Sequence, residues 1–246
     1  MFGESYLLGH FTTLMYIFFS SFLYKNFENR VIKGSENSFN FEEKLEEAYI
    51  ESVFDDRVSK SGFNSFDEWA EQSQTTALIF IRRDTIVYEK YFNGFSRDSY
   101  FHSQSVAKSF ISFLIGAAID GGLIKSVDEP ITQYVPELIK RDPRFEKITI
   151  KNLLEMRSGI KYNTDFLPFI NIHAPWNDEV IGYYHPNLRK ILLEELEVES
   201  EPGEAFEYNN YNTSYLGLII ERATGKTVSK YLEEKLWSQI MEYDAL

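Results

Sequence analysis

The sequence contains no cysteine, which excludes disulfide bonds, thiolate metal sites, lipid anchors on cysteine and a cysteine nucleophile. Histidine is also rare, because only four occur in 246 residues and none of them lies in an HExxH or His-x-His spacing. Such isolated histidines give little support to a metal centre. No GxGxxG loop, P-loop or GxSxG elbow is present either. We therefore expect a protein that uses neither a metal nor a cofactor.

Positive charge is scarce as well, since 25 Lys and Arg residues face 38 Asp and Glu residues and give a formal net charge of −13. This charge repels nucleic-acid phosphates and anionic lipid headgroups, so we do not expect nucleic acid as a partner. Apolar residues make up 43% of the chain, with 21 Phe and 16 Tyr, which is enough for a hydrophobic core. The chain is therefore expected to fold, as one large domain or two small ones.

One segment near the N-terminus is predicted to meet the membrane. Residues 6–24 (YLLGHFTTLMYIFFSSFLY) form a nineteen-residue run without Asp, Glu, Lys or Arg, about the length that crosses the hydrocarbon core of a bilayer. The start carries Glu4 instead of basic residues and no small-x-small cleavage site follows, which favours an anchor, residues 1–24, over a cleaved signal peptide. Basic residues follow directly at Lys25, Arg30 and Lys33. By the positive-inside rule they would keep the rest of the chain in the cytoplasm.

The remaining chain is expected to form a tether with surface helices, residues 25–71, and then a main domain, residues 72–246. Two β-rich runs, ALIFI and IVYEKYF, are separated by a short polar turn and predict a hairpin. The nearly all-apolar residues 105–120 predict a helix buried on all sides, followed by a mostly helical block. The fold class is therefore α+β, with an antiparallel sheet of which only the first hairpin is present. Because a lone hairpin rarely supports itself, the other strands are expected beyond Leu246.

Two Ser-x-x-Lys patterns are present, at Ser105 with Lys108 and at Ser158 with Lys161. A serine nucleophile needs a base, and a lysine three residues later shares its helix face, so that the amine can reach the hydroxyl. Gly159 interrupts the helix in the second pattern, whereas Ser105 opens the apolar helix, whose N-terminus favours a developing oxyanion. We therefore predict Ser105 as the nucleophile and Lys108, as a neutral amine, as its base. The alternative is a serine cap beside an exposed lysine.

Further polar candidates lie in the stretch EPGEAFEYNNYN, which precedes a predicted helix. Tyr208 could share the proton of Lys108 and pass it to a leaving group, and Asn210 could hold the lysine and an amide carbonyl by hydrogen bonds. Alternatively, these residues only form turns and caps. Trp176, in a loop-rich stretch, is a candidate for lining a substrate pocket, although an aromatic in such a loop equally often anchors a small core.

These motifs occur in a familiar order. They are the SVAK that begins at Ser105, the stretch ITIKNLLEMRSGI, Pro202-Gly203 leading to Tyr208-x-Asn210, and YLGLIIERATGKTVSKYLEEKLW. Together they resemble the β-lactamase-related serine hydrolases, a family of class C β-lactamases, DD-peptidases, related esterases and 6-aminohexanoate-dimer hydrolases. The resemblance runs from about Thr75 to the end, and the phrases around Trp176 and Tyr208 look most similar to the aminohexanoate-dimer hydrolase branch.

The resemblance implies a β-lactamase/transpeptidase-like fold and an acyl-enzyme on Ser105. Lys108 and Tyr208 would exchange the proton, and Asn210 would position the lysine and a small-molecule amide or ester substrate, which could be a β-lactam, a peptide or an aminohexanoate-type amide. It also implies that the catalytic part lies outside the cytoplasm on a single-pass membrane anchor. This orientation disagrees with the one that the positive-inside rule predicts. The family's third motif, Lys or His followed by Ser/Thr-Gly, is not found.

Without the strand that carries this third motif, one oxyanion donor would be missing, at a cost of about 10²–10³ in rate. The sequence therefore also leaves open two alternatives. One is a non-catalytic binding or sensor protein that keeps the penicillin-recognising fold, and the other is an inactive truncated fragment.

Overall fold

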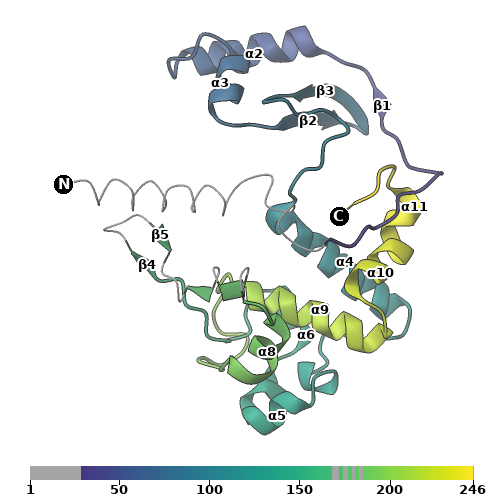
Figure 1. The fold of residues 1–246 in the computed structure, drawn as a ribbon, viewed down its shortest axis with the longest axis vertical. Coiled ribbons are helices and arrows are strands. Elements are labelled where there is room, and N and C mark those ends of the chain that lie inside the picture. Colours follow the sequence, from purple (N-terminus) through teal and green to yellow (C-terminus); the bar gives the residue numbers. More distant parts are fainter. Residues whose placement is uncertain (1–28, 168–171, 174–176, 179–180, 183–184, 246) are drawn as a thin grey trace. The chain divides into compact units, whose positions relative to one another are not determined.

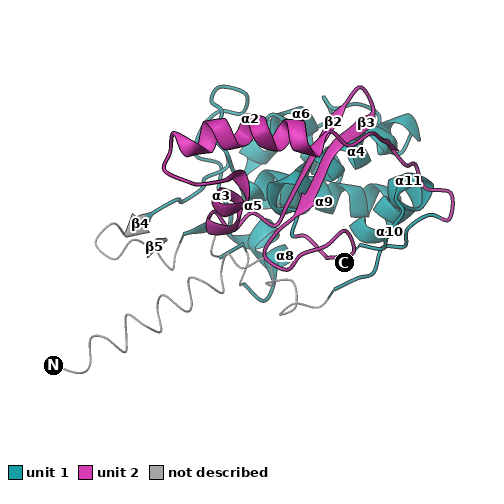
Figure 2. Cartoon of the chain, turned by 90° about the horizontal axis from the view of Figure 1, so that it is seen from above, with its two compact units in different colours: residues 1–35, 102–246 teal, residues 36–101 magenta. Residues whose placement is uncertain are grey.

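The structure of the chain is a computed structural model (Figure 1), and it describes residues 29–167, 172–173, 177–178, 181–182 and 185–245. The chain divides into two compact units: residues 36–101, and a larger unit of residues 1–35 with 102–246 (Figure 2). Each unit has its own hydrophobic core. The domain boundaries predicted after residues 24 and 71 stay predictions.

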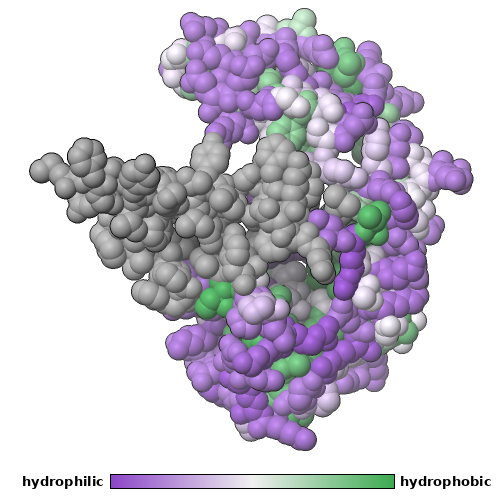
Figure 3. Space-filling model, viewed as in Figure 1, coloured by the Kyte–Doolittle hydropathy of each residue, from purple (hydrophilic) through white to green (hydrophobic). Residues whose placement is uncertain are grey.

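The predicted membrane anchor, residues 1–24, lies outside the described residues. No helix in the part of the chain that the structure describes is long and apolar enough to span a bilayer. On the face shown in Figure 3, the described surface is mostly hydrophilic, with scattered apolar areas. This agrees with the net charge of −13. The anchor therefore stays a prediction.

The smaller unit contains a three-stranded sheet in the order β1-β3-β2. Strands β2 (Ala77–Arg82) and β3 (Thr85–Tyr91) form the predicted antiparallel hairpin, and the turn residues Arg83 and Asp84 have positive φ angles of 52° and 59°. Two successive left-handed residues are typical of a type I′ turn, which matches the twist of the flanking strands. Strand β1 (Glu42–Glu43) pairs with β3 in parallel.

The prediction of an antiparallel sheet with only its first hairpin is therefore wrong in one respect, because the third strand β1 is present and parallel. Both residues of β1 are glutamates with exposed side chains, and the pairing continues where the Lys44 N–H donates to the Ile86 carbonyl, at 2.9 Å. A two-residue strand cannot show the alternation of apolar and polar residues from which strands are predicted.

Two helices, α2 (Glu47–Ser59) and α3 (Phe66–Gln72), complete the smaller unit. Helix α3 begins after Ser65, whose side chain accepts a hydrogen bond from the Glu68 N–H at 3.1 Å. The core of this unit is rich in aromatic rings that stack or meet edge to face. These rings belong to Phe54, Phe66, Trp69, Phe80, Tyr88 and Phe92.

The larger unit is mostly helical. Its first helical segments are η2 (Gln104–Val106), α4 (Ala107–Asp120), η3 (Ile131–Gln133), α5 (Glu137–Arg141), η4 (Pro143–Lys147) and α6 (Ile150–Leu154). Then come strands β4 (Phe166–Leu167) and β5 (Ile172–His173), helix α8 (Leu188–Lys190) running into η5 (Ile191–Glu195), and α9 (Asn210–Thr224). The last helix runs through α10 (Val228–Leu232), η6 (Glu233–Trp237) and α11 (Ser238–Ile240). The mostly helical block that was predicted after residue 120 is therefore present.

Helices α4 and α9 pack against each other in the larger unit. Their fully buried apolar side chains include Leu114, Ile115 and Ala118 of α4 and Tyr215, Ile219 and Ile220 of α9. Helix α6 also packs on α9. This arrangement matters for the site because the first turns of α4 and α9 carry predicted site residues.

The prediction that α4 is buried on all sides is wrong. One stripe of the helix, Ser109, Ser112, Phe113 and Gly116, is exposed, and Phe113 has 43% of its surface accessible. The spacing of these residues places them on one helix face. Three of the four are serine or glycine, which carry little apolar surface, so this face gains little from burial. The prediction relied on the high average apolarity of the helix and overlooked the helical spacing of Ser109 and Ser112, which marks this face as less apolar.

The backbone at Gly159 is expected to be a sensitive point for stability. Gly159 has φ +72°, and a Cβ atom there would lie 2.2 Å from the carbonyl oxygen of Ser200. The Gly159 carbonyl in turn accepts the Glu199 N–H at 2.8 Å, which holds the two segments together. Gly159→Ala is expected to lower the free energy of unfolding by about 2–4 kcal/mol, because the left-handed backbone and the clash both cost energy. Urea unfolding measures the loss.

Gly122→Ala is the matched control for this prediction. Gly122 has nearly the same backbone angle, φ +69°, but no atom lies within 4 Å of a Cβ built there. Its substitution is expected to cost only about 1–2 kcal/mol, from the left-handed conformation alone. Equal losses for the two variants would contradict a role for the contact with Ser200.

Candidate active site

Ser105, Lys108 and Tyr208 meet in the structure. Lys108 Nζ donates a hydrogen bond to Ser105 Oγ at 2.9 Å, and the Tyr208 hydroxyl donates to the same oxygen at 2.7 Å. Lys108 Nζ also lies 5.0 Å from the centre of the Tyr208 ring. A serine hydroxyl within hydrogen-bond reach of an amine and a phenol has the geometry required for proton transfer from the nucleophile. Both Ser105 and Tyr208 are exposed, so a substrate can reach them.

The backbone before Ser105, the predicted nucleophile, is unusual. Ser105 lies in the short 3-10 turn η2, which leads directly into α4, and places Lys108 in the first turn of that helix. Gln104 has a positive φ of 47° although it is not glycine. Such a conformation costs of order 1–3 kcal/mol and tends to occur at functional sites. Sequence reasoning missed this residue, because a left-handed backbone is predicted only where glycine or asparagine occurs.

Tyr208 is positioned by its neighbour in sequence, Asn209. The Asn209 side chain accepts the Tyr211 N–H at 2.9 Å, which caps α9, and its amide group donates to the Ile160 carbonyl at 2.9 Å. Asn209 has only 1% of its surface exposed, and its two bonds join the start of α9 to the turn after α6. Helix α9 therefore begins at Asn210, within the polar stretch that was expected to precede the helix, because its cap is Asn209.

The predicted Pro202-Gly203 motif supports the same region. The Gly203 N–H donates to the Arg157 carbonyl at 2.7 Å, and Arg157 Nε donates back to the Gly203 carbonyl at 2.9 Å. Further along, the Glu207 N–H donates to the Met156 carbonyl at 2.9 Å. These bonds fix the segment that carries Tyr208 against the turn after α6.

Asn210 takes a different partner from the one predicted. Its amide nitrogen donates to the Tyr162 hydroxyl at 3.0 Å, and Tyr162 is buried and meets the Tyr211 ring edge to face. The Oδ1 atom of Asn210 is buried and has no hydrogen-bond partner among the described residues. Asn210 and Lys108 line the same pocket, so a role in positioning substrate stays a prediction. Trp176, the other predicted pocket residue, lies outside the described residues.

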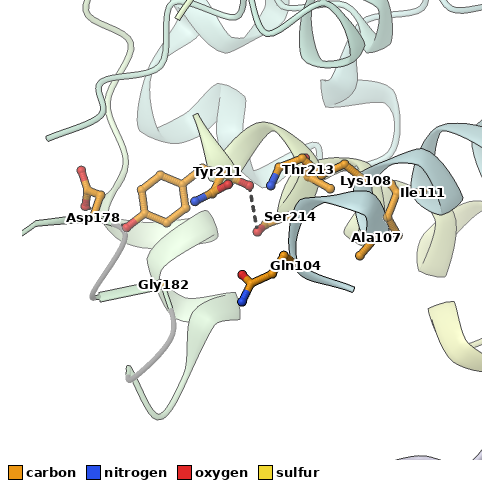
Figure 4. Close-up of a pocket in the computed structure, with 10 residues that line it drawn as sticks. Gln104, Ala107, Lys108, Ile111, Asp178, Gly182, Tyr211, Thr213 and Ser214 are labelled. Carbon is orange, nitrogen blue, oxygen red and sulfur yellow. Dashed lines mark hydrogen bonds between the residues drawn. The ribbon is translucent and has the colours of Figure 1, made fainter. Parts of the chain in front are cut away.

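The pocket beside Lys108 has a volume of about 220 Å³ (Figure 4). Its lining includes Gln104, Ala107, Lys108, Asp178, Asn210 and Tyr211. Asp178 was missed by the sequence reasoning. Its carboxylate accepts the Tyr211 hydroxyl at 2.8 Å and the Asn163 N–H at 2.6 Å. Burial and the hydrogen bond to Asp178 raise the pKa of the Tyr211 hydroxyl, which therefore remains a donor.

In the second Ser-x-x-Lys pattern, at Ser158 and Lys161, the serine hydroxyl is part of a buried turn. Ser158 has 2% of its surface exposed, and its hydroxyl accepts the Ile160 N–H at 3.2 Å, in the turn that contains Gly159. Lys161 is exposed. A hydroxyl that is buried and bonded in a turn is not available to a substrate. The geometry therefore favours Ser105 over Ser158.

Comparison with known proteins gives the family. The beta-lactamase family model matches residues 51–241, so the likeness begins earlier than the predicted start near Thr75. The 6-aminohexanoate-dimer hydrolase of Paenarthrobacter ureafaciens is 31% identical over 176 residues, which make up 69% of this chain and 43% of that protein. This relative belongs to the branch that the motifs around Trp176 and Tyr208 predicted.

Solved structures show the same fold. A Bacillus anthracis protein, provisionally described as a 6-aminohexanoate-dimer hydrolase, matches with a TM-score of 0.71 and 25% identity over 93% of this chain and 61% of that one. A protein of Bacteroides dorei, provisionally described as a beta-lactamase, matches with a TM-score of 0.56 and 23% identity over 75% of this chain and 50% of that one. The chain thus spans less than two thirds of these relatives.

The predicted β-lactamase/transpeptidase-like fold is confirmed by these likenesses, with the three-stranded sheet and the helices described above. The predicted family is confirmed as well, since the matched residues cover well over half of the chain. The chain belongs to the beta-lactamase family.

Proposed function

We propose that the chain is a serine hydrolase that cleaves amide or ester bonds of small molecules through an acyl-enzyme on Ser105. The observation that carries this proposal is the pair of hydrogen bonds to Ser105 Oγ, from the amine of Lys108 at 2.9 Å and from the phenol of Tyr208 at 2.7 Å. The name of a relative, 6-aminohexanoate-dimer hydrolase, supports amides as the substrate class.

In the first step, the neutral amine of Lys108 accepts the proton of Ser105 while Oγ attacks the carbonyl carbon of the substrate. The new C–O bond turns the carbonyl oxygen into an oxyanion, and the positive end of helix α4 lies beside it. As the bond to the leaving group breaks, the proton passes from Lys108 through the Tyr208 hydroxyl to the departing amine or alcohol. The product of this step is an ester between Ser105 and the acyl half of the substrate.

In the second step, water attacks this ester. Lys108 and Tyr208 take the proton from the water and return it to Ser105 Oγ, which releases the acid and restores the free serine. We assign the positioning of the substrate to Asn210, because it lines the same pocket as Lys108.

Covalent labelling tests the proposal. A neutral fluorophosphonate is expected to form one adduct, on Ser105, because only a serine with a base in reach attacks phosphorus at a useful rate. Mass spectrometry of the intact chain and of its peptides counts and locates the adduct.

Ser109→Ala is the matched control, because Ser109 is an exposed serine on the same helix. It is expected to keep the label, whereas Ser105→Ala is expected to lose it. No adduct, or an adduct that persists in Ser105→Ala, would refute the proposed nucleophile.

A further inference from the structure

The helical segment that contains Ser105 is interrupted directly before this residue. Ser103, Val106 and Ala107 all have right-handed helical backbone angles, with φ of −70°, −59° and −52°. Gln104 lies between them with a φ of 47°. A single left-handed residue cannot continue a right-handed helix. The helical segment therefore begins at this point and does not run further upstream.

The sequence itself does not require this interruption. Residues 101–105 (FHSQS) contain neither proline nor glycine, the two residues that most often break a helix. The other left-handed non-glycine residues that the structure describes are explained by turn geometry, because each follows the end of a helix or strand or lies in the hairpin turn. They are Gln74, Arg83, Asp84, Asn93 and Met156. Gln104 differs from all of these, because it stands where a helix begins.

The interruption decides which groups can bind the Ser105 hydroxyl. Inside a helix, a serine hydroxyl often donates to the backbone carbonyl three or four residues upstream. Among the described residues, Ser105 Oγ has hydrogen bonds to Lys108 Nζ and to the Tyr208 hydroxyl, and none to a carbonyl. Because Gln104 is left-handed, the helix supplies no upstream carbonyl that could take the Ser105 proton in place of the lysine.

We infer that Gln104 is a positioning residue, whose left-handed backbone starts the helix at the nucleophile and so leaves the Ser105 hydroxyl to Lys108 and Tyr208. This inference rests on the proposed function, because it concerns the nucleophile of the same site. The role belongs to the backbone of Gln104 and not to its side-chain amide, although that side chain also lines the pocket beside Lys108 (Figure 4). The reactivity of Ser105 is therefore expected to follow the ease with which residue 104 adopts a left-handed backbone.

The rate at which a neutral fluorophosphonate labels Ser105 tests the inference in three variants. Glycine adopts a left-handed backbone without a penalty, asparagine does so more readily than most residues, and β-branched valine very rarely does. Gln104→Gly and Gln104→Asn are each expected to label at least about tenfold faster than Gln104→Val. Mass spectrometry of the intact chain over time measures the rates. Equal rates in Gln104→Gly and Gln104→Val, both of which lack the amide, would overturn the inference.

Gln74 provides the matched control, because it is an exposed glutamine with a φ of 55° in the smaller unit. Gln74→Gly and Gln74→Val are expected to label Ser105 at equal rates. Urea unfolding is expected to show a similar difference in stability between glycine and valine at both positions. A tenfold difference in labelling within the Gln74 pair would mean that any loss of stability slows the reaction, and the inference would then be wrong.

The outcomes separate the inference from the proposed function. If Ser105 is labelled in the unchanged chain but the rates of the Gln104 variants do not differ, the inference alone is wrong. If Ser105 is not labelled in the unchanged chain, the proposed function fails and the inference fails with it. Should Gln104→Val not fold, Gln104→Ala takes its place, because alanine also carries the left-handed penalty that glycine lacks. Gln104→Gly is then expected to label about threefold or more faster than Gln104→Ala, and equal rates overturn the inference.

Discussion

Replacing Ser105 with alanine is expected to lower kcat/KM for an amide substrate by about 10⁴–10⁶-fold, because the variant cannot form the acyl-enzyme. The side chain is exposed and lies in the short turn before α4, so the free energy of unfolding is expected to change by less than about 0.5 kcal/mol. Steady-state hydrolysis measures the first quantity, and urea unfolding measures the second.

Ser112→Ala is the control for the loss of a hydroxyl from the same part of the fold, since Ser112 is exposed on α4. It is expected to retain the rate of the unchanged chain. A loss of less than tenfold in Ser105→Ala would show that the reaction does not pass through this oxygen. A loss of equal size in both variants would show a structural effect on α4 instead of a chemical one.

Replacing Lys108 with methionine is expected to lower kcat/KM by about 10²–10⁴-fold, the usual contribution of a general base. Methionine keeps an unbranched stem in the half-buried site and removes only the amine, so Ser105 loses its hydrogen bond of 2.9 Å while the packing of the helix is kept. The same assay is used as for the serine variant. Lys151→Met, an exposed lysine on α6, is the control and is expected to keep full activity.

The double variant Ser105→Ala with Lys108→Met separates two explanations of that loss. If Lys108 acts only by taking the proton of Ser105, removing the amine costs nothing further once the hydroxyl is gone. The double variant is then expected to have the same residual rate as Ser105→Ala alone. A rate lower by another factor of 10² or more would mean that Lys108 acts on the substrate independently of the serine.

The local part of the site was predictable because its geometry is set within one helical turn. A lysine three residues after a serine at the start of a helix lies over that serine whatever surrounds the helix, and the hydrogen bond between Lys108 and Ser105 is of this kind. The preference for Ser105 over Ser158 also came from local sequence, since a glycine directly follows Ser158, and in the structure Gly159 has a left-handed backbone, beyond the end of α6 at Leu154. Tyr208 was predicted from the order of motifs and could not be placed by any local rule.

The rest of the site depends on contacts between segments far apart in the chain. The bond between Asn210 and Tyr162 spans 48 residues, and that between Tyr211 and Asp178 spans 33. No spacing rule relates such residues, because the distance between them is set by how α9 packs against the turn after α6 and the loop beyond it. The predicted partner of Asn210 was Lys108, which shares only the pocket. Asp178 carried no pattern at all.

Side-chain type and spacing along one element were enough to predict the hairpin, the helices with clear periodicity and the residues that could supply chemistry, because all of these depend on local sequence. Packing between distant segments brings Tyr208 to Ser105 across 103 residues, leaves one face of α4 exposed, and places the carboxylate of Asp178 in the lining of the pocket beside Lys108. Burial and long-range hydrogen bonds depend on how distant segments pack against one another, and no pattern within one segment specifies that packing.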